Sequence, residues 1–190
     1  MTYDIMLDLE TLSTRPNAVI TNLAAIKFDP FGNDINSIDG DTIKMNTFYR
    51  RVDPGSFDWP SAHIDPNTID WWSKQAPEAL DEVISPNDRH NIRDVLRDLY
   101  KWAGKPRRVW ANGAAFDSVI VENACRELER AWPWEYWQVR DSRTIMKIVD
   151  VPRTTVKHHH ALWDCYCQIV DLQAAFRKLN ITSFAEDVNA

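Results

Sequence analysis

The sequence predicts a mixed α/β protein in which helices pack on a central sheet of about five strands. Two observations predict this class. Three strand-like segments with short connections come first, and strand-like and helix-like segments then alternate along the rest of the chain. The chain has 190 residues and a hydrophobic content of 44%, which suit one core. We therefore expect residues 1–190 to form a single domain.

The three N-terminal strands are expected at residues 3–10, 22–28 and 47–52. Apolar and acidic side chains alternate along the first of them, as they do on a strand. Pro30 to Asn33 reads as a turn, and the stretch 34–46 is polar and irregular. Short connections of this kind are typical of antiparallel strands, so these first three strands should form an antiparallel meander.

The remaining elements follow from capping and periodicity. Asp65 and Pro66 begin a helix, as N-cap and first helical residue. Apolar residues at helical spacing from Ile92 predict another helix, which Gly104 ends. The next expected elements, in chain order, are a strand at 108–111, a helix at 116–131, a short strand at 137–140 and helices at 142–149 and 161–179. Asn180 is expected just beyond the last helix.

Composition narrows the class of protein. The net charge of −6 does not favour a protein that binds long duplexes by neutralising phosphates. No apolar run approaches the ~20 residues of a membrane span, so a soluble cytoplasmic protein is expected. Three cysteines without framework spacing argue against a disulfide scaffold. Arg50 and Arg51, on the third strand, are expected to be solvated.

Four acids form the first candidate site. Asp8 and Glu10 are two apart on the first strand, so both side chains leave the same face, ~6.5 Å apart along the backbone. Two carboxylates at the end of an apolar strand are expensive to bury without a cation, and carboxylate oxygens suit Mg²⁺ or Mn²⁺. Asp117, at the start of a helix, and Asp164, in the last helix, are the candidate partners.

A run of three histidines, 158–160, precedes Asp164. Such a run can be a solvated loop, a metal clamp or the location of a general base. Helical periodicity alone favours His160, because it lies four residues before Asp164. Cys165 and Cys167 could suggest zinc, but a single CxC lacks the second ligand pair of a structural zinc module.

Taken together, these residues resemble the DEDDh family of 3′→5′ exonucleases. The first motif of that family, DxE, is Asp8-Leu9-Glu10, and the second, NGAAFD, ends at Asp117. The third, H-x4-D, runs from His159 to Asp164. Segments 68–79 and 137–144 are also similar to phage DexA-type exonucleases and small RNase T-like bacterial exoribonucleases.

The resemblance implies an RNase H-like fold and a two-metal-ion hydrolysis of single-stranded nucleic acid, with DNA slightly favoured over RNA. Nucleoside 5′-monophosphates would leave from the 3′ end. Asp8, Glu10 and Asp164 would hold one Mg²⁺ or Mn²⁺, and Asp8 with Asp117 the second. His159 would be the general base, in a loop before a helix that begins near His160. Relatives in this family also suggest a homodimer.

Substrate contacts are expected from residues near these motifs. The resemblance places Thr11 and Leu12 beside the terminal nucleotide, and the further candidates are Asn112, Trp72 and Arg140. Trp71 and Trp72 cannot face the same way on a helix, so one belongs to the core and the other could stack on a base. Two rival classes remain: a non-catalytic module that binds nucleic-acid ends, and a zinc-stabilised interaction protein.

Overall fold

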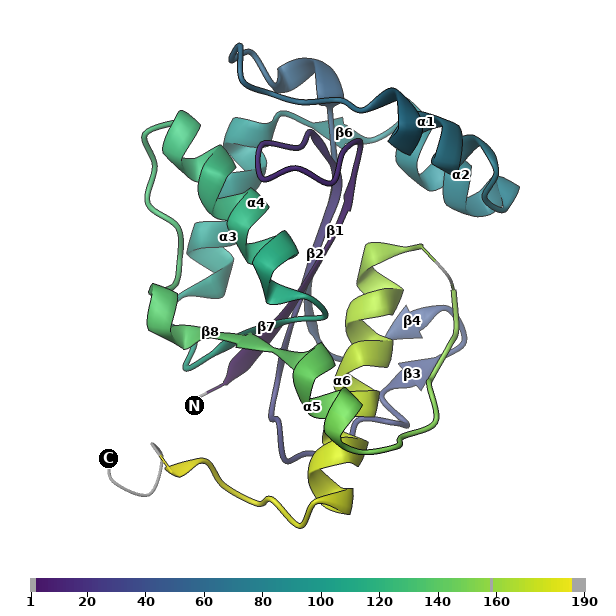
Figure 1. The fold of residues 1–190 in the computed structure, drawn as a ribbon, viewed down its shortest axis with the longest axis vertical. Coiled ribbons are helices and arrows are strands. Elements are labelled where there is room, and N and C mark those ends of the chain that lie inside the picture. Colours follow the sequence, from purple (N-terminus) through teal and green to yellow (C-terminus); the bar gives the residue numbers. More distant parts are fainter. Residues whose placement is uncertain (1–2, 158, 186–190) are drawn as a thin grey trace.

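The computed structural model describes residues 3–157 and 159–185, and a mixed sheet with helices on both faces is its centre (Figure 1). Within this described part the sheet has six strands in the order β6-β5-β2-β1-β7-β8. Their bounds are β1 (Asp4–Thr11), β2 (Ile20–Phe28), β5 (Asn46–Val52), β6 (Arg89–His90), β7 (Val109–Ala111) and β8 (Val139–Asp141). A separate small hairpin, β3 (Ile38–Asp39) and β4 (Thr42–Ile43), interrupts the stretch that was expected to be irregular.

Strand pairing places β1 at the centre of the sheet. It pairs antiparallel with β2, and β2 pairs antiparallel with β5, as the short connections predicted. On its other side β1 pairs parallel with β7 at Ile5 and Met6 only, and β7 pairs parallel with β8. The second half of β1 therefore extends beyond its partner on the β7 side, and its backbone there needs another acceptor.

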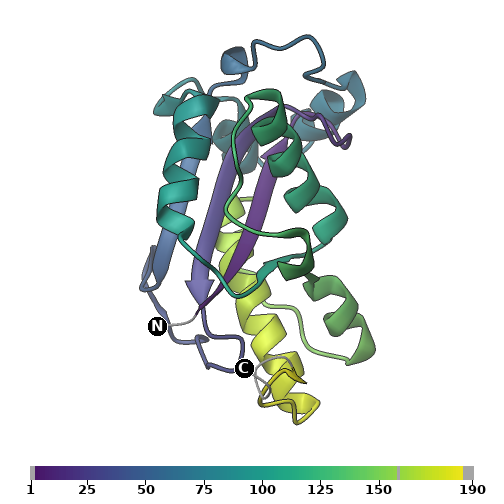
Figure 2. The same ribbon diagram turned by 90° about the vertical axis from the view of Figure 1, so that its left-hand side faces the viewer.

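The helices divide between the two faces of the sheet. Their bounds are α1 (Pro66–Ser73), α2 (Pro77–Ile84), α3 (Ile92–Ala103), α4 (Ala114–Glu127), α5 (Ser142–Ile148) and α6 (Ala161–Lys178), with short 3₁₀ turns at Pro54–Ser56 and Tyr136–Gln138. Figure 2 shows α3 and α4 on the near face of the sheet and α6 on the far face.

The alternation along β1 decides which side chains meet which helix. Ile5, Leu7 and Leu9 are buried in the cluster that includes α3 and α4. Met6, on the opposite face, is buried in the cluster that includes α6. Because side chains alternate along a strand, Asp8 and Glu10 leave the face of Met6, which α6 covers.

A buried ion pair fixes the start of β1. Asp4 and Arg108 are 1% and 2% exposed, with 3.2 Å between Asp4 Oδ1 and Arg108 Nη1. Trp110 Nε1 donates to Asp4 at 2.8 Å. The segment after α6 covers this pair, because the ring of Phe184 lies 4.0 Å from the Arg108 guanidinium carbon. The segment after α6 therefore contributes to the core, as α6 itself does.

Several expected elements differ from the structure at their ends. The helix expected at 116–131 begins earlier, at Ala114, and ends at Glu127, because Glu129 has a positive φ of 51° that a helix cannot continue through. The strand expected at 137–140 is displaced to Val139–Asp141, because a 3₁₀ turn with a capping box occupies Tyr136–Gln138. Asn180 adopts a positive φ after α6, as predicted.

Besides the β3–β4 hairpin, helix α2 and strand β6 were not expected from the sequence. Helix α2 begins at Pro77 with Ala76 in the N-cap position and no side-chain cap, so the usual polar start signal is absent from the sequence. Strand β6 has only two residues, too few to show a periodicity. The sheet accordingly has one strand more than the five expected.

Gly113 lets β7 turn directly into α4. Its φ is +116°, a value that residues with a side chain rarely adopt, and a Cβ there would lie 3.2 Å from Arg143 Nη2. Asp141 replaces the missing cap, because its carboxylate accepts from Ala114 N at 3.1 Å. The same carboxylate caps α5 by accepting from Thr144 N at 3.0 Å. One acid thus fixes the first turns of two helices.

Among the described residues, no helix combines the length and the apolar character that crossing a bilayer needs.

Candidate active site

Three carboxylates from two elements meet beside the second half of β1. Asp8 and Glu10 come from β1, and Asp164 comes from the first turn of α6. One potential ligand atom from each lies within 4.8 Å of the others. We call these three residues the acid cluster. Glu10 is 8% exposed, while Asp8 and Asp164 are half-buried.

The neighbouring residue Gln168, one turn further along α6, orients the cluster. Its Nε2 donates to Asp8 Oδ1 at 2.7 Å, and its own Oε1 is buried without a hydrogen-bond partner. Sequence reasoning missed this residue. Its spacing of four from Asp164 was the available signal, because residues i and i+4 share a helix face.

Asp117 reaches β1 from the other side. It lies in the first turn of α4, is 4% exposed, and its Oδ1 accepts a hydrogen bond from Leu9 N at 3.1 Å. This bond provides an acceptor for the backbone amide of Leu9, which lies in the part of β1 that extends beyond β7. Asp117 is not one of the three residues within 4.8 Å, but its charge acts on Asp8 more strongly than that of any other acid does.

The electrostatics of the site favour a cation. Burial raises the pKa values of Asp8 and Glu10 well above those of ordinary carboxyl groups, and repulsion from the neighbouring carboxylates adds to it. Burial also raises the pKa of Asp117 to about 7. A divalent ion among these oxygens would remove the repulsion, and oxygen-only ligands suit hard cations. The residues present therefore fit a divalent metal.

The cysteines do not contribute to this group. Cys165 is fully buried, and its Sγ lies 3.7 Å from the carbonyl oxygens of Met6 and Ala24. Burial raises the pKa values of Cys165 and Cys167, which disfavours the thiolate that zinc needs. Among the described residues, neither cysteine belongs to a group of three candidate ligands.

The histidine run lies at the start of α6. His160 is the N-cap of that helix, so the helix begins where the third motif required. His159 precedes it with a positive φ of 57°, and its ring meets the rings of Trp71 and Trp72 edge-on, with centroids 5.0 and 5.8 Å apart. His158 lies outside the described residues. A catalytic role for His159 stays a prediction.

A cavity of about 450 Å³ opens beside Glu10. Residues of β1, the loop after it, α1 with its N-cap, and α4 line it: Leu9, Glu10, Thr11, Thr14, Asp65, Asn67, Thr68, Trp71, Trp72 and Phe116. Thr11 lines this cavity, and its contact with the terminal nucleotide stays a prediction. Leu12 is buried in a small apolar cluster and lines a different cavity.

The two tryptophans of α1 differ in exposure. Trp72, named above as a substrate contact, is 3% exposed, and its Nε1 donates to Thr11 O at 2.9 Å. Trp71 is 44% exposed. The reason is that α1 packs through its Trp72 side on Leu12 and α2. Trp71 is accordingly the better candidate for stacking.

Two further candidates make hydrogen bonds elsewhere. The backbone carbonyl of Asn112 accepts from Arg143 Nη2 at 2.6 Å, and its side-chain Oδ1 accepts from Arg143 Nε at 3.5 Å. Arg140 Nη1 donates to the carbonyls of Trp137 and Val139 at 2.5 and 3.1 Å. Neither Asn112 nor Arg140 is among the described residues that line the cavity beside Glu10.

Comparison with known proteins identifies the family. Residues 3–176 match the family described as the Rv2179c-like 3′-5′ exoribonuclease domain. The chain belongs to this family. The sequence-based prediction of a DEDDh-type 3′→5′ exonuclease is thereby confirmed.

Individual relatives agree with this membership. The exodeoxyribonuclease of Enterobacteria phage T4 is 24% identical over 220 residues, which cover 92% of this chain and 89% of that protein. Exonuclease I of E. coli in complex with a dA16 oligonucleotide has a TM-score of 0.63 at 15% identity over 96% of this chain. A zinc-bound form of the same enzyme with single-stranded DNA has a TM-score of 0.64 at 14% identity over 95% of this chain.

These solved structures share the fold of this chain. The chain spans 42% and 41% of the two exonuclease I chains, so it corresponds to less than half of that enzyme. Their similarity confirms the predicted RNase H-like architecture.

Proposed function

We propose that this exonuclease-family chain is a metal-dependent enzyme that hydrolyses single-stranded nucleic acid from the 3′ end to nucleoside 5′-monophosphates, with residues 1–190 acting as one domain. The observation that carries the proposal is the acid cluster, with its ligand atoms within 4.8 Å of one another at the edge of a cavity. Family membership supplies the reaction class.

The acids would hold the metal. Asp8, Glu10 and Asp164 would bind one Mg²⁺ or Mn²⁺, and Asp117 with Asp8 the second. Two divalent ions bound there would supply a hydroxide nucleophile and neutralise the leaving oxygen. Gln168 fixes the rotamer of Asp8 through its 2.7 Å hydrogen bond, so the carboxylate needs little reorganisation when a cation arrives.

His159 would accept the proton of the attacking water on an imidazole nitrogen. Histidine suits this role because its ordinary pKa lies near neutrality. Its position outside α6, one residue before the N-cap, allows the ring to turn toward the cluster while Asp164 stays fixed on the helix.

The cavity beside Glu10 would receive the terminal nucleoside. Its volume of about 450 Å³ lies in the range of small-molecule pockets, and it adjoins the acid that would hold the metal. A base could stack on Trp71 or Phe116, since every base has a π face. Thr11 lines the same space.

The substrate is proposed to be single-stranded DNA in preference to RNA. The T4 relative, matched over nearly its whole length, is an exodeoxyribonuclease, and the E. coli exonuclease I structure holds a deoxyoligonucleotide. The family description names exoribonuclease activity, so both nucleic acids need direct comparison.

The test is a digestion time course with 5′-labelled DNA and RNA oligonucleotides of the same sequence, in Mg²⁺ and in EDTA. We expect a ladder that shortens by one nucleotide at a time from the 3′ end, faster on DNA, and no cleavage in EDTA. Asp164→Asn should abolish it and exposed Asp39→Asn should not. Faster digestion of RNA would overturn the substrate preference, and the absence of shortening on both substrates would overturn the proposed function.

A further inference from the structure

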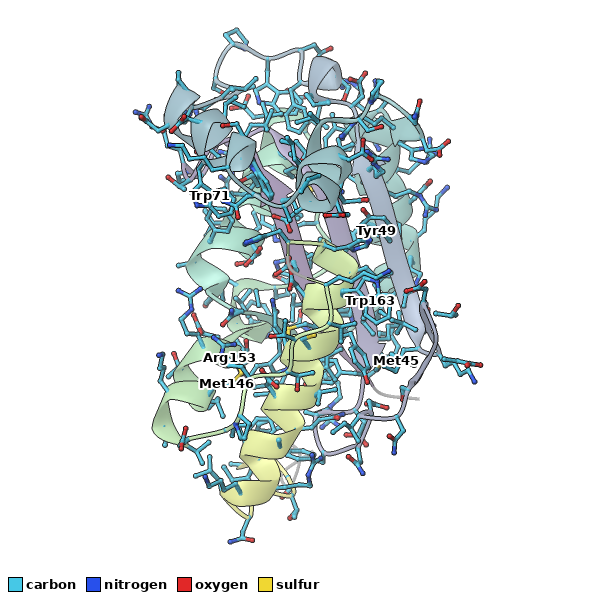
Figure 3. All side chains as sticks on the ribbon, turned by 90° about the vertical axis from the view of Figure 1, so that its right-hand side faces the viewer. Met45, Tyr49, Trp71, Met146, Arg153 and Trp163 are labelled. Carbon is cyan, nitrogen blue, oxygen red and sulfur yellow. The ribbon has the colours of Figure 1, made fainter. Side chains whose placement is uncertain are left out.

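Aromatic rings hold the segment before α6 on two sides. On one side the ring of His159 meets Trp71 edge-on, 5.0 Å between centroids. On the other, the ring of His160 stacks on Tyr49 of β5, with centroids 5.0 Å apart and an interplanar angle of 25°. Figure 3 shows Trp71 and Tyr49 on opposite sides of the N-terminal end of α6. A positive φ is uncommon for a residue with a side chain, and these ring contacts help to hold His159 in that conformation.

The hydroxyl of Tyr49 is held by hydrogen bonds to two polar residues, Asn22 and Glu82. Its hydroxyl donates to the carboxylate of Glu82 on α2 and accepts from Asn22 Nδ2 at 2.8 Å. Asn22 is fully buried and also donates to Glu82 Oε1 at 3.1 Å. Burial and the hydrogen bond to Glu82 raise the pKa of Tyr49, so the hydroxyl stays protonated and the ring stays oriented.

Two arginines anchor α2, and hence Glu82, to the sheet. Arg51 Nη2 donates to the carbonyls of Asp81 and Ser85 at 2.9 and 3.2 Å, so this side chain is not solvated as the sequence suggested. Arg89 Nε donates to the carbonyl of Ser85 at 2.6 Å. The carboxylate that holds Tyr49 therefore has a defined place relative to β5.

The polar residues Asn22, Tyr49 and Glu82 lie next to the acid cluster but are not part of it. Asn22 is the cross-strand partner of Glu10 in the β1–β2 register, so their side chains share a face. Glu82 lies close enough to raise the pKa of Glu10. The contacts thus run without a break from the sheet beside Glu10, through Tyr49, to the backbone that carries His159.

We propose that Tyr49 is a positioning residue of the exonuclease: its ring supports His160 and thereby holds His159 where it can reach the acid cluster. The inference rests on the proposed role of His159 as the base. Asn22 and Glu82 hold the tyrosine, and the stacked ring carries the effect to the loop.

The experiment is a double-mutant cycle between Tyr49→Leu and His159→Ala, with kcat and KM measured on a 3′-ended DNA oligonucleotide in Mg²⁺. A general base contributes on the order of 10² or more to rate, so a partly displaced one should cost about tenfold. We expect Tyr49→Leu to lower kcat about tenfold with KM little changed, and to add nothing in the His159→Ala background. Tyr49→Phe, which keeps the stacking ring but loses the hydroxyl bonds to Glu82 and Asn22, should lower kcat less than Tyr49→Leu does.

Several results would overturn the inference. Multiplicative losses in the double variant, or an unchanged kcat in Tyr49→Leu, would show that Tyr49 does not act through His159. An unchanged kcat in His159→Ala would refute the role of His159 as general base, and the inference that rests on it. Tyr136→Leu is the matched control, because Tyr136 is 80% exposed. If Tyr49→Leu does not fold, His160→Ala removes the same stack from the other side and takes its place in the cycle.

Discussion

Replacing Asp8 by asparagine should stabilise the metal-free protein and remove its response to divalent metal. A ligand oxygen of Asp8 lies within 4.8 Å of those of Glu10 and Asp164. Two unit charges at that separation repel by about 3 kcal/mol at an effective dielectric constant of ~20. Because Asp8 is half-buried, water screens part of this repulsion, and we expect a gain of about 1–2 kcal/mol in unfolding free energy. Asparagine keeps the oxygen that accepts from Gln168.

Thermal unfolding at pH 8 in EDTA and in MgCl₂ measures this effect. A gain of 1–2 kcal/mol corresponds to a rise of roughly 2–8 °C in Tm for a chain of this size. Metal at a hundredfold excess over its Kd should stabilise the wild-type protein by about 2.7 kcal/mol and the variant far less. Asp39→Asn, at an exposed acid on β3, should leave the metal response unchanged. A variant that is less stable in EDTA, or that keeps the full metal response, would refute the reasoning.

The remaining predictions concern pH, binding and stability. Burial raises the pKa of Asp117 from 3.8 to about 7, so the folded state binds more protons than the unfolded state in that interval, and the metal-free protein should lose stability as pH rises through it. Urea unfolding in EDTA at pH 5 and pH 8 checks this, and greater stability at pH 8 would contradict it. Trp71→Ala should raise the KM for oligonucleotides about tenfold, whereas Trp137→Ala, at a ring 59% exposed and outside the cavity lining, should not. Equal effects of both in steady-state kinetics would contradict the assignment of Trp71. Phe184→Ala should lower the unfolding free energy by about 2 kcal/mol by uncovering Arg108, with kcat retained. An unchanged urea midpoint would contradict that packing role.

The sequence was informative where periodicity and chemistry agree. Alternation along the first strand places Asp8 and Glu10 on one face, and the last helix was expected from residue 161, where α6 begins. The closeness of Asp164 to that strand is a tertiary property, which no local pattern contains. The chemistry of paired carboxylates named Asp164 as a candidate partner, the resemblance to a family supported it, and the 4.8 Å separation comes from the structure.

Other features of the site could not be predicted from the sequence, and each has a physical reason. Helix α2 has no polar N-cap, so neither the helix nor Glu82 beneath Tyr49 could be placed. Adjacent tryptophans must face differently, but which one is buried depends on how α1 packs, and the structure selects Trp72. Helical spacing places Gln168 on the same face as Asp164. Its role could not be predicted from that alone, because it depends on the closeness of Asp8, which only the structure shows.

The central claim is that the acid cluster holds the metal that cleaves the 3′ end. Crystals of the protein soaked in MnCl₂, with anomalous diffraction recorded at the manganese edge, test it most directly. We predict an anomalous peak at about 2.0–2.3 Å from carboxylate oxygens of Asp8, Glu10 and Asp164, and its loss in Asp8→Asn. An occupied manganese site elsewhere with none at these three residues, in crystals of protein that digests oligonucleotides, would contradict the account.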